Sequence, residues 1–362
     1  ELEINNGYTG VWASSSGAVL TVTSRLMGAA GNAIALAASP ASGAFQAQTS
    51  GTTLAGGVDG DWRTDLNALP RVNRAATDWS RAFFKALKGY GLDAAAAFSM
   101  ELQHGDPSAA AGIAQRYPNG GAVLLNTPAL QTNFSPASLA FWKEAYLEMA
   151  SLMAQAGMTP YLQFGEVQWW YFPDASGMPF YDTYTTSTFS ATYGRPMHVF
   201  ANSQENPALY PEEAQFLPGL IGAFTNAVMQ FVRQSYPAAR FEALYPPDVN
   251  DSPLNRVINL PAADWTPAAL DNLKTENFTY TGLRDLNKCL DSMRLPIQLG
   301  FPRSQSSHLV GNGDYTTPWL KEVGLAKGEG VESVVLFALD QFCLIGYEAP
   351  LERGERRSLW QG

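Results

Sequence analysis

Apolar residues recur at helical spacing in several stretches of the chain. The clearest stretch begins with Ser135, a residue type that caps helices, and Pro136, which suits the first helical position. Its apolar face consists of large side chains three or four residues apart: Leu139, Trp142, Tyr146, Met149 and Met153. The pattern predicts a buried helix that ends at Gly157. Similar patterns predict helices at residues 78–88, 211–234 and 283–293.

Short apolar runs lie between these helices and predict β-strands. We expect eight strands, at residues 62–66, 94–102, 122–126, 161–167, 241–245, 278–283, 297–301 and 334–339. Alternation of strands with helices indicates parallel pairing through helical crossovers. Eight such units predict an α/β fold, the TIM (β/α)8 barrel, whose chemistry lies at the C-terminal ends of the strands. An open doubly wound sheet is the alternative, although no GxGxxG or P-loop follows a strand.

Residues 1–60 have a different pattern. They are poor in charge and rich in Gly, Ala, Ser and Thr, with short alternating runs at residues 18–26, 33–38 and 44–48. Such runs, separated by glycine-rich turns, predict a small β-rich module. We therefore expect a boundary near residue 60, followed by the barrel domain over residues 61–362.

Composition narrows the classes of partner. The chain has 362 residues, of which 46% are hydrophobic and 15% charged, enough for a barrel of ~250 residues plus a small module. Its net charge of -10 argues against nucleic acid and anionic membrane as partners, since phosphate binding relies on clustered Lys and Arg. No segment approaches the ~18 consecutive apolar residues of a membrane span.

Cysteine spacing and the chain start carry two further expectations. Cys289 and Cys343 lie far apart without a CxxC neighbour, which predicts two buried free thiols instead of a zinc site or disulfide framework. The start, ELEINNGYTG, is not a signal peptide and lacks an initiator Met. We therefore expect processing, or a fragment of a longer polypeptide.

The stretch TPYLQFGEVQWWYF, residues 159–172, is the strongest candidate for chemistry. Glu166 follows an apolar strand and is itself followed by Trp169, Trp170 and Tyr171. Apolar surroundings can raise the pKa of a carboxyl group, and aromatic rings offer flat faces for sugars. A solvated glutamate beside aromatic residues of a protein interface is the alternative.

Polar residues also follow the other predicted strands. The positions at or just beyond the strand ends are Asp65, Glu101, His104, Asn126, Glu166, Asp248, Arg303 and Asp340. In a barrel these positions meet on one rim, which predicts an acidic mouth. The expected aromatic lining is Trp169, Trp170, Tyr171, Tyr245 and Phe342. As an alternative, Asp65 and Asp248 cap helices or turns, Glu101 pairs with Arg116, and Asp340 holds loop amides.

The mouth predicts roles for these side chains. Glu166, Glu101, Asp248 and Asp340 are the candidate catalytic carboxylates. The candidate substrate-binding residues are Trp169, Trp170, Tyr171, Asn126, His104, Tyr245 and Arg303. We expect no metal or other cofactor, because His104, His198 and His308 show no HxH or HExxH spacing. A long insertion at residues 173–206 predicts a lid, a binding surface or a contact with a neighbouring subunit.

Two resemblances extend these expectations. The segments MGAAGNAIALAAS and SGTTLAGGVDG, within residues 20–60, resemble a small β unit of phage tail sheath and other tail proteins. The barrel, with QFGEVQWW closing its fourth strand, resembles glycoside hydrolase TIM barrels whose acid/base glutamate ends strand four. That resemblance implies an acid/base role for Glu166.

The chain departs from the hydrolase pattern at two positions. The Asn that usually precedes the acid/base glutamate is Gly165, and the nucleophilic glutamate of strand seven is replaced by the run GFPR at residues 300–303. A second carboxylate would then come from Glu101, Asp248 or Asp340. Glu101 suits the wider separation of inverting enzymes, about 6.5–9.5 Å between carboxyl groups.

Together the resemblances imply a fragment of a phage or prophage tail protein, similar to non-contractile tail sheath proteins with a TIM-barrel domain. Its barrel is expected to recognise cell-surface glycan, with hydrolysis by Glu166 left open. The alternatives are a free-standing glycoside hydrolase acting on a polysaccharide and a catalytically dead scaffold. The expected partners are carbohydrate and other virion tail subunits, and the expected location is the virion or the extracellular space.

Overall fold

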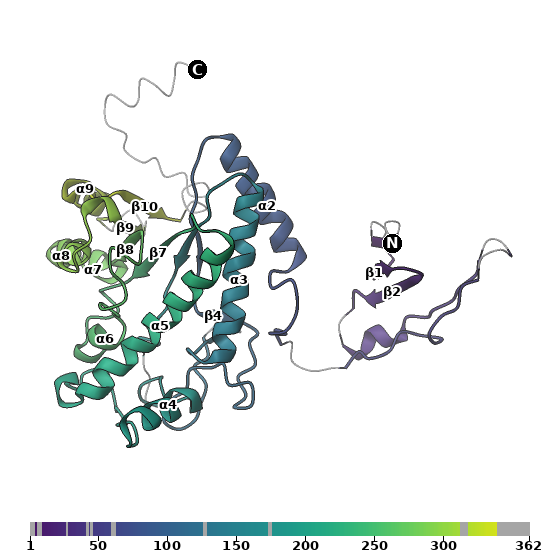
Figure 1. The fold of residues 1–362 in the computed structure, drawn as a ribbon, viewed down its shortest axis with the longest axis horizontal. Helices are drawn as coiled ribbons and strands as arrows, with labels where there is room; N and C mark the ends of the chain where they lie inside the picture. The colour runs from purple at the N-terminus through teal and green to yellow at the C-terminus, as the bar shows by residue number, and fades with distance from the viewer. Residues whose placement is uncertain are drawn as a thin grey trace, which may run out of the picture. The chain divides into compact units, whose positions relative to one another are not determined.

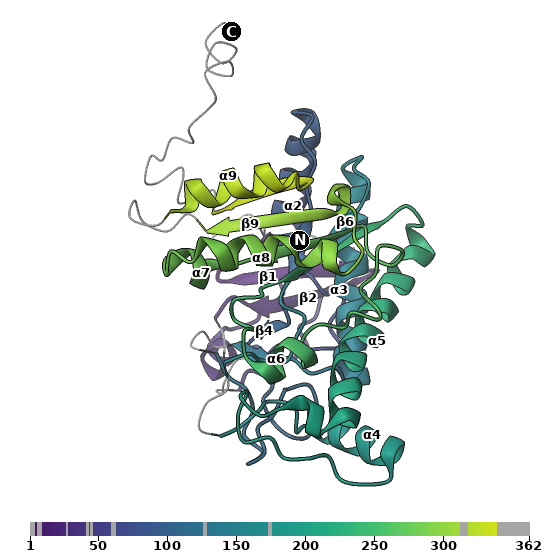
Figure 2. The same ribbon diagram turned by 90° about the vertical axis from the view of Figure 1, so that its left-hand side faces the viewer.

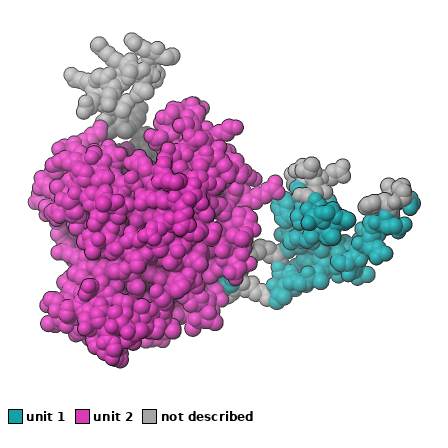
Figure 3. Space-filling view, in the orientation of Figure 1, with its two compact units in different colours: residues 1–63 teal, residues 64–362 magenta. Residues whose placement is uncertain are grey.

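The computed structural model describes residues 4–5, 9–26, 28–40, 43, 46–58, 63–125, 129–172, 176–311 and 318–338. The chain divides into two compact units, residues 1–63 and 64–362, coloured separately in Figure 3. Each unit is described by itself. Among the residues so described, no helix is long and apolar enough to cross a membrane.

The first unit is built on one antiparallel hairpin. Strands β1 (Val11–Ser16) and β2 (Val19–Ser24) pair with Val11 opposite Ser24, and Gly17 adopts the positive φ of 58° that the tight turn requires. A short 3-10 helix, η1 (Ala29–Ala33), follows. Of the described apolar side chains in this unit, only Val11 and Ala13 are buried. The unit therefore has little core of its own.

The second unit contains a six-stranded sheet in which every pairing is parallel. In spatial order its strands are β10 (Ser333–Phe337), β9 (Ser306–Gly311), β8 (Asn272–Glu276), β7 (Arg240–Tyr245), β6 (Tyr161–Phe164) and β3 (Ala96–Phe98). The sheet curls into half a TIM barrel (Figure 2). Because the pairing is parallel throughout, all C-terminal strand ends lie at one rim.

Helices connect these strands and cover the outer face of the sheet (Figure 1). They are α2 (Arg74–Gly89), α3 (Pro136–Gln155), α4 (Thr183–Tyr193), α5 (Pro211–Ser235), α6 (Pro253–Ile258), α7 (Phe278–Gly282), α8 (Leu286–Gln298) and α9 (Trp319–Glu329), with 3-10 turns η2 (Pro207–Leu209) and η3 (Arg303–Gln305). Side chains cap several N-termini. Asn73 accepts a hydrogen bond from the amide of Ala76, and Ser135 accepts one from that of Ser138.

Alternation along β6 and β7 places mostly apolar side chains on the outer face and mostly polar side chains on the inner face. On the outer face, the ring of Phe164 stacks on Phe241 at 5.6 Å between centroids and packs against Tyr146 of α3. On the inner face, the ammonium group of Lys274 contacts the carboxylate of Glu242 at 2.5 Å. The interior of the barrel is therefore polar along β7 and β8.

Much of the predicted arrangement is confirmed. Strands β6, β7 and β10 lie where strands were expected at residues 161–167, 241–245 and 334–339, and α2, α3 and α5 match predicted helices. The run at residues 94–102 is split between β3 and β4 (Glu101–Gln103), which pairs antiparallel with β5 (Ala129–Gln131). Residues 63–66 form no strand, and residue 62 lies outside the described residues.

Two predicted strands are wrong. Residues 278–283 form α7 and the turn after it, and residues 297–301 lie at the end of α8 and in the following turn. The actual strands, β8 and β9, read NLKTE and SSHLVG. Their apolar signal is weak because buried polar side chains find partners on both faces of the sheet: Lys274 of β8 contacts Gln163 and Glu242 inside the barrel, and His308 of β9 contacts Glu322 of α9 on the outer face.

Candidate functional site

A cavity of about 480 Å³ opens on the inner face of the curled sheet. Its polar lining includes Gln163, Glu166, Lys274 and Glu276, and its apolar lining includes Phe98, Phe278, Leu309 and Phe337. These residues come from five different strands or the segments that directly follow them. The cavity therefore occupies the predicted barrel mouth, with two carboxyl groups set among aromatic and aliphatic side chains.

Glu166 is held in this cavity by a close contact between two strands. The amide of Gly165 donates to the carbonyl oxygen of Phe98 at 2.7 Å, and a Cβ at position 165 would lie 3.1 Å from that oxygen. Glycine at this position therefore follows from the approach of β3 to β6. Glu166 itself has a φ of 51°, in the left-handed region that side-chain-bearing residues rarely adopt. Such strain persists where surrounding structure enforces it, and it gathers at functional sites.

The surroundings of Glu166 act on its pKa in opposite directions. Burial of the carboxyl group raises the pKa, and a hydrogen bond from the hydroxyl group of Tyr171 lowers it. The nearby carboxylate of Glu101 raises it further. The net effect is a raised pKa of Glu166, and the hydrogen bond from Tyr171 stabilises the ionised form of this carboxyl group.

Glu276 is the site residue that the sequence prediction missed. It is the last residue of β8 and lies on the same side of the sheet as Lys274, because side chains two residues apart in a strand share a face. Burial raises the pKa of Glu276 to about 8, with additional contributions from the carboxylates of Glu166 and Asp248. The alternation of polar residues at 272, 274 and 276 with Leu273 and Thr275 was the available signal.

Glu166 and Glu276 form an unequal pair. Strand β7 separates β6 from β8, so their backbones lie roughly 10 Å apart at the usual spacing of about 4.8 Å per strand. The carboxylate of Glu166 raises the pKa of Glu276, and only Glu166 has the compensating hydrogen bond from Tyr171. At neutral pH Glu276 is therefore mostly protonated, and Glu166 is the more acidic of the two.

The other predicted carboxylates have different positions. Glu101 begins β4 beside the cavity, and burial raises its pKa. Asp248 lies buried in the loop after β7, where its carboxylate accepts hydrogen bonds from the amides of Thr279 at 2.6 Å and Val249 at 2.9 Å. Asp248 thus holds the start of α7, as in the capping alternative. Asp340 lies outside the described residues.

The aromatic run after Glu166 is divided between the core and half-buried positions. Trp169 is fully buried, its ring nitrogen donates to the carbonyl oxygen of Leu217 at 3.2 Å, and its ring packs edge-on against Phe134. This corrects its predicted role, because a fully buried ring cannot stack on a ligand. Trp170 and Tyr171 are half-buried and stack on each other at 5.1 Å.

Three more predicted binding residues have other surroundings. Tyr245 is buried and lines a different cavity, on the outer side of β7. Arg303 lies in η3, before β9 begins, and pairs with Glu329 at 3.5 Å. It is at the opposite end of its strand from the mouth, because strand 297–301 was misplaced. His104 follows β4 with a φ of 53° and is half-buried. Asn126 and Phe342 lie outside the described residues.

The insertion at residues 173–206 is largely part of the core. Phe180, Phe189 and Phe200 are fully buried, and Arg195 binds the buried carboxylate of Glu213 in α5 at 2.7 Å. The insertion is therefore anchored to the barrel over much of its length. Within the described ranges, no group of three or more His, Cys, Asp or Glu side chains is placed to hold a metal ion.

Comparison with known proteins supplies a family and several similar folds. A family model described as "Non-contractile tail sheath protein TIM barrel" matches residues 58–347. A search of curated proteins gave no match. Similar solved structures are the agarase AgWH50C (9% identity, TM-score 0.43), an exo-β-agarase (10%, 0.42) and a glucosidase from Croceicoccus marinus (11%, 0.37). The aligned regions cover 71%, 71% and 75% of this chain, and 40%, 37% and 48% of those chains.

Proposed function

The chain belongs to the non-contractile tail sheath protein TIM-barrel family, and from that premise we propose that its barrel recognises cell-surface glycan. A tail sheath family implies a virion component that associates with other tail proteins. Recognition of glycan would give the barrel of such a component a task beyond building the tail.

The observation that supports this proposal is the pairing of Glu166 and Glu276 in one aromatic-lined cavity. Carboxyl groups hydrogen-bond sugar hydroxyls, and aromatic rings stack on sugar faces, so the lining has both requirements for a carbohydrate ligand. The cavity, at about 480 Å³, is within the usual size range of small-ligand sites. The positive φ of Glu166 is a strained conformation, and such strain clusters at ligand-binding and catalytic sites.

We further propose that the barrel hydrolyses glycan, with separate roles for Glu276 and Glu166. Protonated Glu276 would donate its proton to the glycosidic oxygen as the carbon–oxygen bond breaks. The carboxylate of Glu166, held by Tyr171, would take a proton from water as that water adds to the anomeric carbon. Strands separated by one intervening strand leave room for this water, which favours inversion. The assignment reverses the acid role that the hydrolase resemblance implied for Glu166.

A catalytically inert scaffold is the second candidate. Trp169 belongs to the core and Asp248 holds backbone amides, so two predicted ligands of the mouth have structural tasks instead. A free-standing glycosidase would use the same cavity, but it would not account for the tail sheath family.

Glycan-array binding and turnover of polysaccharide or peptidoglycan fragments test the proposal. We expect the wild-type chain to bind a glycan and Glu276→Gln to lose at least tenfold in affinity or turnover. Asp93→Asn, which changes an exposed carboxylate elsewhere, is the matched control and should behave as wild type. Loss of turnover with retained binding in Glu166→Gln supports hydrolysis. Absence of both activities in the wild-type chain supports the scaffold.

A further inference from the structure

The backbone that follows Glu166 is held by the side-chain carboxamide of Gln115, which is fully buried. The oxygen of this carboxamide accepts a hydrogen bond from the amide of Trp170 at 2.8 Å. Its nitrogen donates to the carbonyl oxygens of Gln168, at 2.9 Å, and Thr132, at 3.1 Å. Exchanging the oxygen and the nitrogen would break all three bonds, so the side chain has a single orientation.

Asn259, directly after α6, holds the same backbone. Its side-chain oxygen accepts a hydrogen bond from the amide of Trp169 at 2.8 Å, and its nitrogen donates to the carbonyl oxygen of that residue at 3.1 Å. The nitrogen also donates to the side chain of Asn250 at 2.9 Å, and Asn250 donates to the side chain of Gln168 at 2.8 Å. Residues 168–170 are therefore bound by buried carboxamides from separate parts of the chain.

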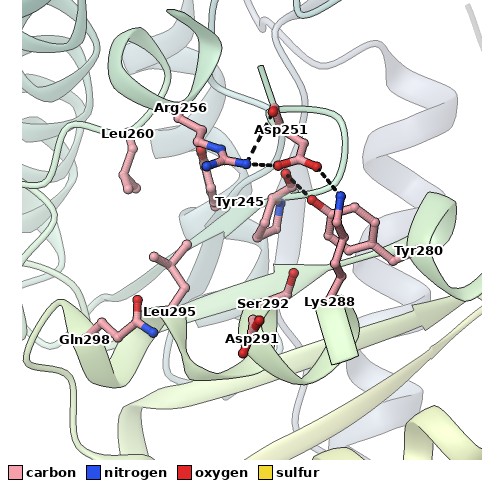
Figure 4. Close-up of a pocket in the computed structure, with 11 residues that line it drawn as sticks. Tyr245, Asp251, Arg256, Leu260, Tyr280, Lys288, Asp291, Ser292, Leu295 and Gln298 are labelled. Carbon is pink, nitrogen blue, oxygen red and sulfur yellow. Dashed lines mark hydrogen bonds and ion pairs between the residues drawn. The ribbon is translucent and has the colours of Figure 1, made fainter. Parts of the chain in front are cut away.

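Helix α6 has contacts on two sides. Asn255 of this helix donates a hydrogen bond to the carbonyl oxygen of Tyr171 at 3.2 Å. Arg256 binds the carboxylate of Asp251, which also binds the ammonium of Lys288 in α8 at 2.7 Å (Figure 4). These charged groups lie at the cavity on the outer side of β7. Helix α6 thus connects the backbone beyond β6 to α8.

This support accounts for the backbone conformation of Glu166. A residue with a side chain keeps a positive φ, here 51°, only where its surroundings enforce it. Before Glu166, the amide of Gly165 donates to the carbonyl oxygen of Phe98 at 2.7 Å. After it, the amide of Gln168 donates back to the carbonyl oxygen of Glu166 at 3.0 Å, and Gln168 is itself held by Gln115. Glu166 therefore lies between two fixed points of the backbone.

We propose that Gln115 and Asn259 are positioning residues, which fix the carboxyl group of Glu166 in the inner cavity. Neither is among the described residues that line this cavity, so each acts through the backbone that it binds. The effect on glycan rests on the proposed function. The placement of Glu166 does not, because it can be measured in the protein without a ligand.

Two variants of the full chain test the proposal. Gln115→Met keeps the length of the side chain and removes its three hydrogen bonds. Asn259→Ser is a milder change that leaves one polar atom in place of two. Thr225→Val is the matched control, because it removes an equally buried hydrogen bond, from the ring nitrogen of Trp265 to α5.

Three measurements are made on each protein. Urea denaturation shows that the variant is folded, and NMR titration of the side-chain carboxyl carbons, assigned with Glu166→Gln, gives the pKa of Glu166. Binding to a glycan array gives the affinity for carbohydrate. A residue that only stabilises the fold would change the urea midpoint and leave the titration of Glu166 as it is in the wild type.

We expect the pKa of Glu166 to fall towards the usual value of a glutamate in Gln115→Met and in Asn259→Ser. Burial is the largest cause of its raised pKa, and a released backbone admits water to the carboxyl group. Affinity for glycan should fall at least roughly tenfold, because a displaced group no longer meets its ligand. Thr225→Val should retain the wild-type pKa and affinity.

A folded Gln115→Met or Asn259→Ser chain in which Glu166 titrates as in the wild type overturns the proposal. An equal change of the Glu166 pKa in Thr225→Val overturns it too, because the change would then follow from lost stability. Failure of both carboxamide variants to fold would show that these side chains support the whole domain, which also contradicts a positioning role. A wild type that binds no glycan refutes the proposed function instead, and the titration still decides the placement of Glu166.

Discussion

The inner face of the barrel holds two groups of carboxyl side chains with different surroundings. Deeper along the strands, the carboxylate of Glu242 binds the ammonium of Lys274 at 2.5 Å and the hydroxyl of Tyr161 at 2.6 Å. At the C-terminal ends, no cation among the described residues pairs with Glu166 or Glu276, and the carboxylate of Glu166 raises the pKa of Glu276. The residues of both groups lie on β6, β7 and β8 or in the loop that follows β6.

A buried carboxylate that is paired with a cation stabilises the fold, whereas a buried carboxyl group without a cation is available for chemistry. A buried carboxylate with a bound cation has its charge compensated and its geometry fixed. A buried carboxyl group without one shifts its pKa toward the operating pH, where it can exchange a proton. Substitutions in the deeper group should therefore act on stability, and those at the mouth should act on titration and ligand binding.

Lys274→Met should give the largest effect, since it leaves the buried carboxylate of Glu242 without its cation. We expect a loss of about 3–5 kcal/mol in the free energy of unfolding, measured by urea denaturation. The double variant Lys274→Met/Glu242→Leu removes both charges and should regain most of that loss. Equal stability of the single variant and the wild type would show that the deeper pair does not stabilise the fold.

Glu276 should make stability depend on pH. Its pKa is about 8 in the folded chain and about 4.3 when unfolded, so the folded state binds more protons between these values. Stability is therefore highest at the acidic end of this window and falls as pH rises toward 8. We expect a fall of about 1–3 kcal/mol between pH 5 and 9 that is attributable to this group.

Glu276→Gln is the test of that slope, because glutamine resembles the protonated acid and does not titrate. Urea midpoints of the variant should change less with pH than those of the wild type, and Asp93→Asn should retain the wild-type slope. If the wild type, Glu276→Gln and Asp93→Asn show the same dependence of stability on pH, the pKa of Glu276 is not raised. The proposed difference between the mouth and the Lys274–Glu242 pair would then be wrong.

The sequence predicted parts of this contrast and missed others for physical reasons. Strand β6 was found because LQF is apolar on its outer face, and Glu166 followed from it. Strand β8 was missed because Lys274 and Glu276 point into the barrel, where partners far away in sequence accommodate their polar groups. Arg303 was assigned to the mouth only because β9 was placed several residues too early.

The aromatic run shows a second limit. Trp169, Trp170 and Tyr171 are adjacent in sequence, and local pattern does not say which ring enters the core. The structure buries Trp169 completely and leaves the next two half-buried. The choice is made by long-range contacts, such as the hydrogen bond from Trp169 to Leu217 of α5. The mouth could thus be located from sequence, while its individual ligands could not.

Tyr171→Phe should give the smallest effect and test the asymmetry within the mouth. Removing the hydroxyl group deletes the hydrogen bond that lowers the pKa of Glu166, so that pKa should rise. NMR titration of the glutamate side-chain carboxyl carbons, assigned with Glu166→Gln and Glu276→Gln, measures the change. The pKa of Glu276 should change less, since the causes of its shift are burial and neighbouring carboxylates. Equal shifts at both residues would mean that Tyr171 does not distinguish them, and the assignment of Glu166 as the ionised partner would be lost.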